Sequence, residues 1–270
     1  MSIFHEHKPK SFTEFVAFVE KVQKKSRNPL WYRGCSDSNY KLLPRLYRHR
    51  RITEIGQLTE LEYQLMTRFR QRSIPFHNKP LDNDWESLFF MQHYGIPTRL
   101  LDWTENPFIA LYFAVMSSNF VYKMNKLRYK KSASIWILDP ICWNRRALKH
   151  ESYDQGILST SDEQIKGYTP TARFVKMNDL PVALFGTHNS QRIVAQRGVF
   201  VIFGKNKLGM ETTFNLEDFP ENCLIKVTID KKVLPGIRRS ILNHGITESV
   251  VFPDLEGLAK EIRRSFEFEV

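Results

Sequence analysis

The sequence predicts a mixed α+β fold in a single domain. Its first half contains stretches with apolar residues at helical spacing, and its second half contains short apolar runs typical of strands. No repeat and no low-complexity linker interrupts the 270 residues, and a hydrophobic content of 42% is sufficient for a core. We therefore expect one α+β domain over residues 1–270, with a helix-rich half at 1–150 and a strand-rich half at 151–270.

The elements of the first half are predicted from capping residues and apolar spacing. Ser11 and Glu14 precede an apolar stripe as a capping box does, which predicts a helix over 12–25. Asn28-Pro29 ends this helix, and a short strand is expected over 30–32. The further expectations are helices at 54–72, at 83–94 and, from an Asn-Pro start, at 107–118, with loops at 41–51 and 98–104.

The second half is expected to contain most of the strands. Its apolar runs predict strands at 134–138, 182–185, 199–203, 223–229 and 249–252, and helices at 231–243 and 254–266. The stretch 151–181 is polar and is expected to be irregular. Before Gly198, polar residues are expected to alternate along a strand, where they line a cleft or form the solvent face of an edge strand. They are Asn189, Gln191, Arg192 and Gln196.

The positive charge of the chain belongs to its first half. Residues 1–150 hold 25 Lys and Arg against 13 Asp and Glu, whereas residues 151–270 hold 15 against 16. This excess indicates either a solvated basic face or a polyanionic partner, nucleic acid first. Cations among aromatic residues favour single strands. The candidate nucleic-acid-binding residues are Arg45, Arg48, Lys126, Arg128 and Lys130, with Tyr47, Phe69 and Tyr129 as stacking side chains.

Cysteine usage and hydropathy indicate the compartment. Cys35, Cys142 and Cys223 are widely spaced without a CxxC pair, which is typical of a reducing compartment and gives no zinc pattern. The N-terminal residues contain no apolar signal core, and no stretch is apolar for the length of a membrane span. We therefore expect a cytoplasmic protein that needs no metal and does not contact a membrane.

The strongest chemical signal is HYGIPTRLLDWTENPFIALYFA at residues 93–114, together with WYRG at 31–34. Arg33 ends a strand beside a glycine, which suits bidentate contact with phosphate or diphosphate oxygens. Polar side chains are expected to converge in the loop before the apolar helix, at the positive end of its dipole. They are His93, Thr98, Arg99, Asp102 and Thr104. The structural alternatives are a surface ion pair for Arg33, a buried Asp102–Arg99 pair, and a capping role for Thr104.

A carboxylate outside this region, Glu248, is the other candidate for chemistry. It precedes the apolar run expected to form the strand at 249–252. A carboxylate at the start of a strand can act as a general acid or base. It can equally be a solvated turn residue.

Four motifs together resemble the FRG domain family, which is named for a Phe/Tyr-Arg-Gly motif. They are WYRG, residues 93–114, AQRGVF and GITESVVFPDLEGLA, and the resemblance extends over about residues 10–265. The run from Asp102 to Ala114 is also similar to the second motif of ADP-ribosyltransferases, and Arg33 matches their strand-borne arginine. The third motif departs from that pattern, because Gln191, Arg192 and Gln196 stand where acids are expected.

The resemblance implies an ADP-ribosyltransferase-like split β-sheet core with flanking helices, and an enzyme with NAD as co-substrate. The implied catalytic residues are Arg33, Asp102, Thr104 and Glu248, with Glu248 or Asp102 as the acid. The implied NAD-binding residues are Tyr32, Arg33, Gly34, His93, Tyr94, Thr98, Arg99, Trp103 and Gln196.

The resemblance further implies a toxin of a toxin–antitoxin or phage-defence system, with an antitoxin protein as a partner. The basic first half makes nucleic acid, RNA before DNA, the expected acceptor. The alternatives are a protein acceptor and a non-catalytic nucleic-acid-binding module. A nuclease is disfavoured, since no clustered carboxylates of the two-metal kind occur.

Overall fold

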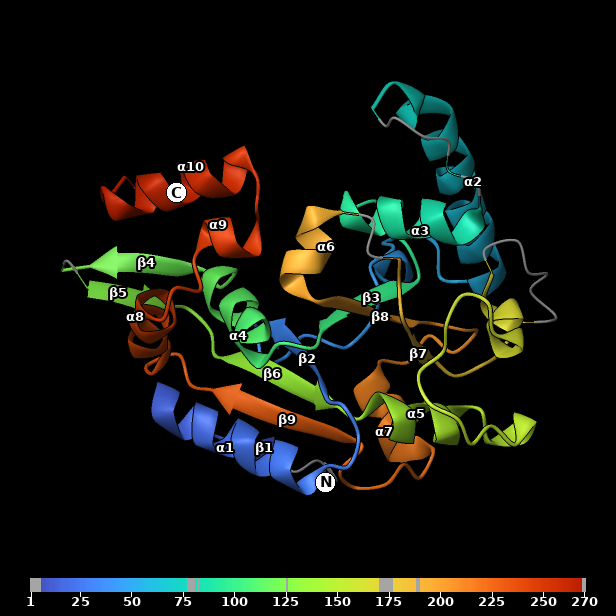
Figure 1. Cartoon of the computed structure of the whole chain (residues 1–270), viewed down its shortest axis with the longest axis horizontal. Coiled ribbons are helices and arrows are strands. Elements are labelled where there is room, and N and C mark those ends of the chain that lie inside the picture. Colours follow the sequence, from blue (N-terminus) through green and yellow to red (C-terminus); the bar gives the residue numbers. More distant parts are fainter. Residues whose placement is uncertain are drawn as a thin grey trace.

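A seven-stranded mixed sheet forms the centre of the computed structural model, with the order β1-β9-β6-β2-β3-β8-β7 (Figure 1). β1 is parallel to β9, and the other neighbours are antiparallel. The structure describes residues 6–76, 81, 83–124, 126–169, 177–187 and 190–268. The strands are β1 Glu6–His7, β2 Trp31–Cys35, β3 Leu100–Thr104, β6 Ala133–Leu138, β7 Val182–Leu184, β8 Gly198–Ile202 and β9 Leu224–Ile229.

Helices cover both sides of the sheet, so the fold is mixed α+β as predicted. They are α1 Phe12–Lys25, α2 Ile55–Ser73, α3 Asp84–His93, α4 Pro107–Met116, α5 Pro140–Ala147, α6 Gln191–Gln196, α7 Met210–Leu216, α8 Leu234–Asn243, α9 Glu248–Val251 and α10 Leu255–Ser265. Short 3-10 helices lie at Leu46–Arg48, Ile74–Phe76, Lys149–Glu151 and Glu163–Tyr168. Among the described residues, no helix is long and apolar enough to span a membrane.

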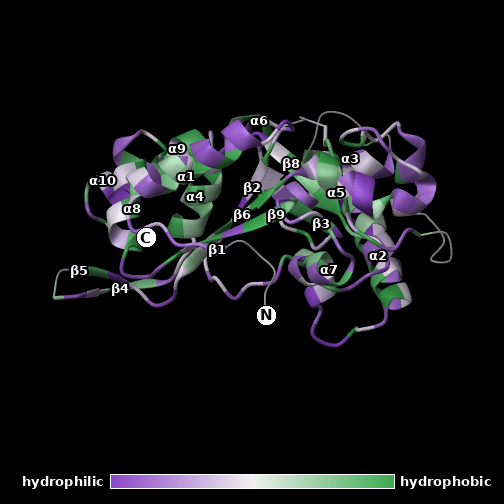
Figure 2. Ribbon diagram, turned by 90° about the horizontal axis from the view of Figure 1, so that it is seen from below, coloured by the Kyte–Doolittle hydropathy of each residue, from purple (hydrophilic) through white to green (hydrophobic). Residues whose placement is uncertain are grey.

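Two apolar clusters hold the sheet between its helices. One joins α2, α3, α5 and α7 to the strands, and the other joins α1, α4 and α8 to them. Figure 1 shows the first group of helices on the right and the second on the left. Successive strand residues point to opposite faces, so Trp31 enters the first cluster and Tyr32 the second. Figure 2 shows the central strands largely in green, as expected for a sheet buried on both faces.

A separate β-hairpin extends from the molecule. β4 Phe120–Lys123 pairs with β5 Lys126–Tyr129 outside the central sheet. Figures 1 and 2 both show this hairpin at one end of the molecule and α2 at the other. The hairpin was not predicted, because its cations obscure the apolar alternation of a strand.

The sheet opens at its middle, between β2 and β3. These neighbours share one registered pair, Tyr32 with Thr104, whereas β2 makes five with β6 and β3 makes five with β8. Beyond that pair the two strands diverge. Arg33 and Asp102 follow and precede the paired residues, so they lie where the strands part.

Gly34 permits the close packing of α4 on β2. A Cβ atom at Gly34 would lie 1.9 Å from the carbonyl oxygen of Ala110 and 2.7 Å from the nitrogen of Ala114. Because both atoms belong to the helix backbone, no side chain fits there. The Tyr-Arg-Gly motif thus combines a core tyrosine, an arginine at the opening and a glycine that admits the helix.

Three predicted elements are wrong. Residues 98–104 are not a loop, since β3 begins at Leu100. Residues 191–196 form the short helix α6, which Ser190 caps by accepting from the backbone nitrogen of Ile193, and not a strand. The run expected as a strand at 249–252 is the short helix α9. Each is six residues or shorter, a length at which tertiary contacts outweigh periodicity.

Candidate functional site

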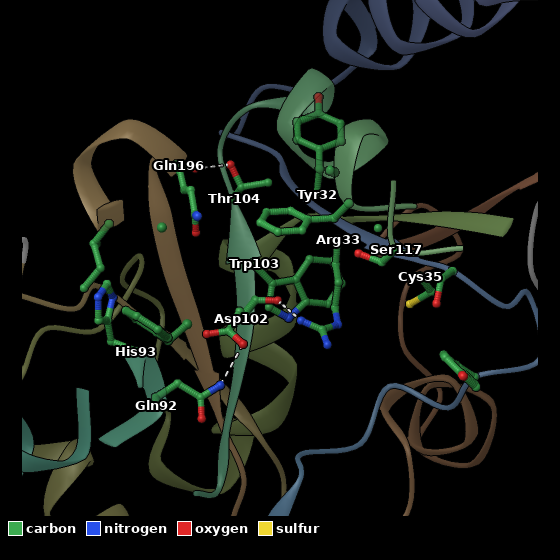
Figure 3. Close-up of a pocket in the computed structure, with 18 of the residues that line it drawn as sticks. Tyr32, Arg33, Cys35, Gln92, His93, Asp102, Trp103, Thr104, Ser117 and Gln196 are labelled. Carbon is green, nitrogen blue, oxygen red and sulfur yellow. Dashed lines mark hydrogen bonds between the residues drawn. The ribbon is translucent and has the colours of Figure 1, made fainter. Parts of the chain in front are cut away.

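A cavity of about 370 Å³ lies where β2 and β3 diverge. β2 contributes Arg33, β3 contributes Asp102, α3 contributes His93 and α6 contributes Arg192, while Lys41 comes from the loop after β2. Figure 3 shows side chains from these separate segments around one space. The volume falls within the range of small-molecule sites in proteins.

Positive charge dominates the walls of the cavity. Four of the lining residues are cationic, namely Arg33, Lys41, Arg48 and Arg192. The acidic residue among those that line it is Asp102. The pKa of Arg48 is lowered by burial and then by the neighbouring cations Arg33 and Arg45. Such crowding of like charges favours an anionic ligand.

Asp102 has an exposed carboxylate in a fixed orientation. The side-chain nitrogen of Gln92 donates to Oδ2 of Asp102 at 2.7 Å, and the hydroxyl of Thr98 donates to Oε1 of Gln92 at 2.6 Å. The second bond fixes which end of the amide faces the carboxylate. Figure 3 shows Gln92 and Arg33 reaching Asp102 from two sides. No hydrogen bond from the described residues reaches the other carboxylate oxygen, Oδ1, which is therefore available to a ligand.

Arg33 faces the cavity without a carboxylate partner among the described residues. Its guanidinium donates to the backbone oxygen of Asp102 and so connects the two diverging strands. A carbonyl oxygen does not cancel the charge of a guanidinium. Its remaining donors can therefore bind an anion bidentately.

Thr104 and Gln196 line the cavity, but their polar groups are largely engaged. The Thr104 hydroxyl donates to the backbone oxygen of Gln196 at 2.6 Å and accepts from the backbone nitrogen of Asn106 at 3.0 Å. The side-chain nitrogen of Gln196 donates to the backbone oxygen of Val251 at 3.0 Å. Thr104 thus ties β3 to α6 and to the start of α4, whereas the cap of α4 is Asn106, whose Oδ1 accepts from the backbone nitrogen of Phe108.

His93 lies on the α3 side of the cavity. Its Nδ1 is 3.4 Å from the Ser190 hydroxyl. Burial lowers the pKa of His93, Arg192 lowers it further, and Asp102 and Asp254 oppose the shift. The ring is therefore neutral at neutral pH and can either donate or accept a hydrogen bond.

The expectation that Arg99 contacts the ligand is wrong. Arg99 is 1% exposed and forms an ion pair of 2.7 Å with Glu62, and it also donates to the backbone oxygens of Phe203 and Tyr168. Its role is to join α2 to the end of the sheet. Thr98 is likewise buried and reaches the site only through Gln92. Of the expected buried pair, the arginine is as predicted but its partner is Glu62, not Asp102.

Two other expected site residues also lie outside the cavity lining. Both Glu248 carboxylate oxygens accept from Nε of Arg264, at 2.8 and 2.9 Å, and Glu248 lines a neighbouring groove on the side of α10. Tyr94 is 67% exposed and does not line the cavity, whereas Tyr32, Gly34 and Trp103 do. Asn189 lies outside the described residues.

The basic stretches separate into two places. Arg48 lines the cavity, and Arg45 donates to the backbone oxygen of Gly95 beside it. Lys126 and Arg128 belong to the hairpin strand β5 and Lys130 follows it, and none of the three lines the cavity. The aromatic residues expected to stack on bases do not fit that role at two positions, because Tyr47 and Tyr129 are buried.

The polar cavity residues that sequence reasoning missed include Gln92, Tyr40 and Lys41. Gln92 directly precedes His93, so its place in the last turn of a helix before the motif was a usable signal. Tyr40 and Lys41 reach the cavity because the chain turns back after β2, and no local sequence pattern predicts that turn. Over the described ranges, no three His, Cys, Asp or Glu side chains are grouped to hold a metal ion.

The fold and cavity define an α+β protein with a cation-rich, ligand-sized site at the opening of its sheet. The family model described as the FRG domain matches residues 28–121, so the chain carries an FRG domain in that segment. No curated protein and no solved structure matches the chain. The matched segment contains Arg33, Tyr40, Arg48, Asp102 and Thr104. It ends before most of the hairpin and before α6 and α9.

Proposed function

We propose that the cavity binds NAD and that the protein transfers ADP-ribose from NAD to a nucleophile on nucleic acid. The observation that carries this proposal is the placement of Arg33 and Asp102 at the opening between β2 and β3. Among the described residues the Arg33 guanidinium has no carboxylate partner, Asp102 is an oriented carboxylate, and the other charged residues of the lining are cations.

The residues present fit the charges of this substrate. The cations Arg33, Arg48 and Lys41 match a diphosphate, which carries two negative charges. The exposed oxygen of Asp102 suits the positive charge that develops on ribose C1′ in an oxocarbenium-like transition state. Trp103 is among the lining residues but is 3% exposed, so it forms a wall of the cavity and not a free stacking surface.

The proposed reaction balances without a further reactant. The bond between the nicotinamide nitrogen and ribose C1′ breaks, and its electron pair stays on nicotinamide, which leaves as a neutral ring. The acceptor oxygen or nitrogen forms the new bond to C1′. Asp102 takes the proton that the acceptor loses and returns it to solvent. The chain's contribution is orientation and placement of charge.

Nicotinamide release from NAD tests the enzyme proposal directly. We expect the purified protein to release nicotinamide, and Asp102→Asn to lower the rate by about 10²-fold or more, the usual loss for a general base. Arg33→Gln should lower it by a similar factor. Glu105→Gln is the matched control, because Glu105 is an exposed acid on the same segment that does not line the cavity.

The enzyme proposal fails if the wild type neither binds NAD in calorimetry nor releases nicotinamide with nucleic acid present. Equal losses from Asp102→Asn and Glu105→Gln would remove Asp102 from the mechanism. The acceptor is tested by labelling in lysate with tagged NAD. A label that survives nucleases and disappears with protease would show a protein acceptor.

The same proposal extends to a toxin held in check by a partner protein. Unrestrained transfer of ADP-ribose would deplete NAD and alter the nucleic acid of the cell that contains the enzyme. We expect growth arrest on expression of this chain alone in bacteria, relieved by Arg33→Gln or Asp102→Asn. Equal growth of wild type and variants at matched protein levels would contradict it.

A further inference from the structure

The segment 40–51 forms the rim of the cavity on the β2 side. Tyr40, Lys41 and Arg48 line the cavity. The rest of the segment is anchored: Leu42 and Leu46 are buried in the core, and the backbone nitrogen of Leu46 donates to the oxygen of Thr98 at 3.3 Å. These buried apolar residues fix the path of the segment, so the cations beside them stay at the surface.

The segment contributes no acid of its own, although Glu211 accepts from the backbone nitrogen of Leu42 at 3.0 Å. No Asp or Glu occurs between Asp37 and Glu54. In the part of the chain that the structure describes, none of the rim cations pairs with a carboxylate. They are Lys41, Arg45, Arg48, Arg50 and Arg51; all five reach the surface, and the guanidinium of Arg48 is half-buried. Repulsion among these cations raises the free energy of the unliganded protein, and a polyanion would relieve it.

Tyr40 adds a stacking surface to the charge. It is 52% exposed, stands next to Lys41, and lines the cavity. An exposed aromatic ring among cations suits an unpaired base followed by phosphates. In a duplex both faces of each base are already stacked, so a single strand fits this surface better.

We propose that residues 40–51 bind a single-stranded nucleic acid and lead it into the cavity. An unpaired base stacks on Tyr40, and phosphates bind Arg50 and Arg51, which leaves the cavity residues Lys41 and Arg48 for the NAD diphosphate. The inference deepens the proposed function by locating its acceptor. It rests on that function only for the transfer that follows binding, because binding itself needs no NAD.

The hairpin is the competing surface, and its geometry disfavours it. The register pairs Val121 with Arg128 and Lys123 with Lys126, so these cations share one face of the hairpin. Phe120 and Tyr122 lie on the other face and line the groove beside α10. Aromatic and cationic side chains are thus on opposite faces, unlike those of the rim.

The experiment measures fluorescence anisotropy of a labelled oligouridine strand with the full chain and no NAD. Arg50→Gln/Arg51→Gln should weaken binding and lower the slope of log affinity against log salt by about 1.4, or about 0.7 for each lost phosphate contact. Tyr40→Ala should weaken binding about tenfold, and Tyr40→Phe should retain it. A duplex probe should bind more weakly than the strand.

The matched control is Lys126→Gln/Arg128→Gln, which removes two exposed cations from the hairpin and should leave affinity and salt slope near wild type. Equal losses from the rim and hairpin variants, or wild-type binding by Tyr40→Ala, would overturn the inference. Nicotinamide release is measured in parallel. If the strand binds as expected but no nicotinamide is released, the transfer fails and the binding surface stands.

Discussion

Arg33 belongs to the motif at residues 31–34 and Arg99 to the motif at residues 93–114, and the structure gives these two arginines opposite roles. Arg99 is enclosed and neutralised: Glu62 pairs with it, and two backbone oxygens accept its other donors. Arg33 is partly exposed, donates to one backbone oxygen, and faces other cations. The presence of a carboxylate partner therefore separates an arginine that holds the fold from one placed for a ligand.

The largest loss of stability is expected from removing the carboxylate that pairs with the buried Arg99. Glu62→Gln leaves the Arg99 guanidinium buried without its partner, which typically destabilises a protein by about 3–5 kcal/mol. Urea unfolding followed by circular dichroism measures this loss. Arg33→Gln should unfold near the wild-type urea concentration, because its environment is already partly exposed.

Glu60→Gln on the same helix is the control, since Glu60 is exposed and its hydrogen bond is with the exposed side chain of Gln64. It should change stability by less than about 0.5 kcal/mol. If Arg33→Gln lowered the free energy of unfolding as much as Glu62→Gln does, both arginines would be structural. The distinction between Arg33 and Arg99 would then be wrong.

A smaller loss of stability is expected from adding a side chain at Gly34, the residue after Arg33. Gly34→Ala places a methyl group against the backbone of α4, and overpacking of this kind costs about 1–3 kcal/mol. Gly56→Ala on α2 is the matched control, because nothing lies within 4 Å of its added Cβ. Alanine is the better helix former, so that variant should be more stable by up to about 1 kcal/mol. Equal melting temperatures for the two variants would refute the packing role of Gly34.

Sequence alone predicted the elements whose signals are local. Ser11, Asn106 and Asp254 were expected to begin helices, and the side chain of each accepts from a backbone nitrogen in the first turn. β3 and α9 were missed because their apolar runs are short, and contacts with distant residues decide their conformation. Glu248, for example, pairs with Arg264 across 16 positions.

The candidate site was also predicted only where its sequence signals are local. Arg33 and Asp102 were found because their motifs are compact, and the structure brings them to one cavity. The pairing of Arg99 with Glu62 could not be foreseen, since 37 positions separate them. Lys41 and Tyr40 were missed for the same reason, because a turn of the chain, and not a motif, brings them to the rim.

Glu248 offers a milder test, in which a second carboxylate is compared with Asp102. Glu248→Gln weakens a partly buried ion pair with Arg264, so we expect a stability loss of up to about 1 kcal/mol. Nicotinamide release should stay near the wild-type rate, since Glu248 does not line the cavity. A rate lowered by about 10²-fold would instead make Glu248 the catalytic acid and require the α10 groove to close on the cavity.

The smallest effect is expected from the titration of His93. Burial and Arg192 lower its pKa in the folded state, whereas in the unfolded chain it titrates near its ordinary value of about 6.5. Between these two pKa values the unfolded chain binds more protons than the folded one, so stability falls as the pH falls through about 6.5. Urea midpoints at about pH 8 and about pH 5.5 measure this loss, and His93→Gln should reduce it. His7, whose pKa burial also lowers, remains in the variant and leaves a residual dependence. An anion in the cavity would offset the charge of Arg192, so phosphate in the buffer should also reduce the loss of stability that His93 causes at low pH.

If His93→Gln kept the full pH dependence of stability, the ring would not sense the charge of Arg192. The cavity would then be better solvated than its crowded cations indicate.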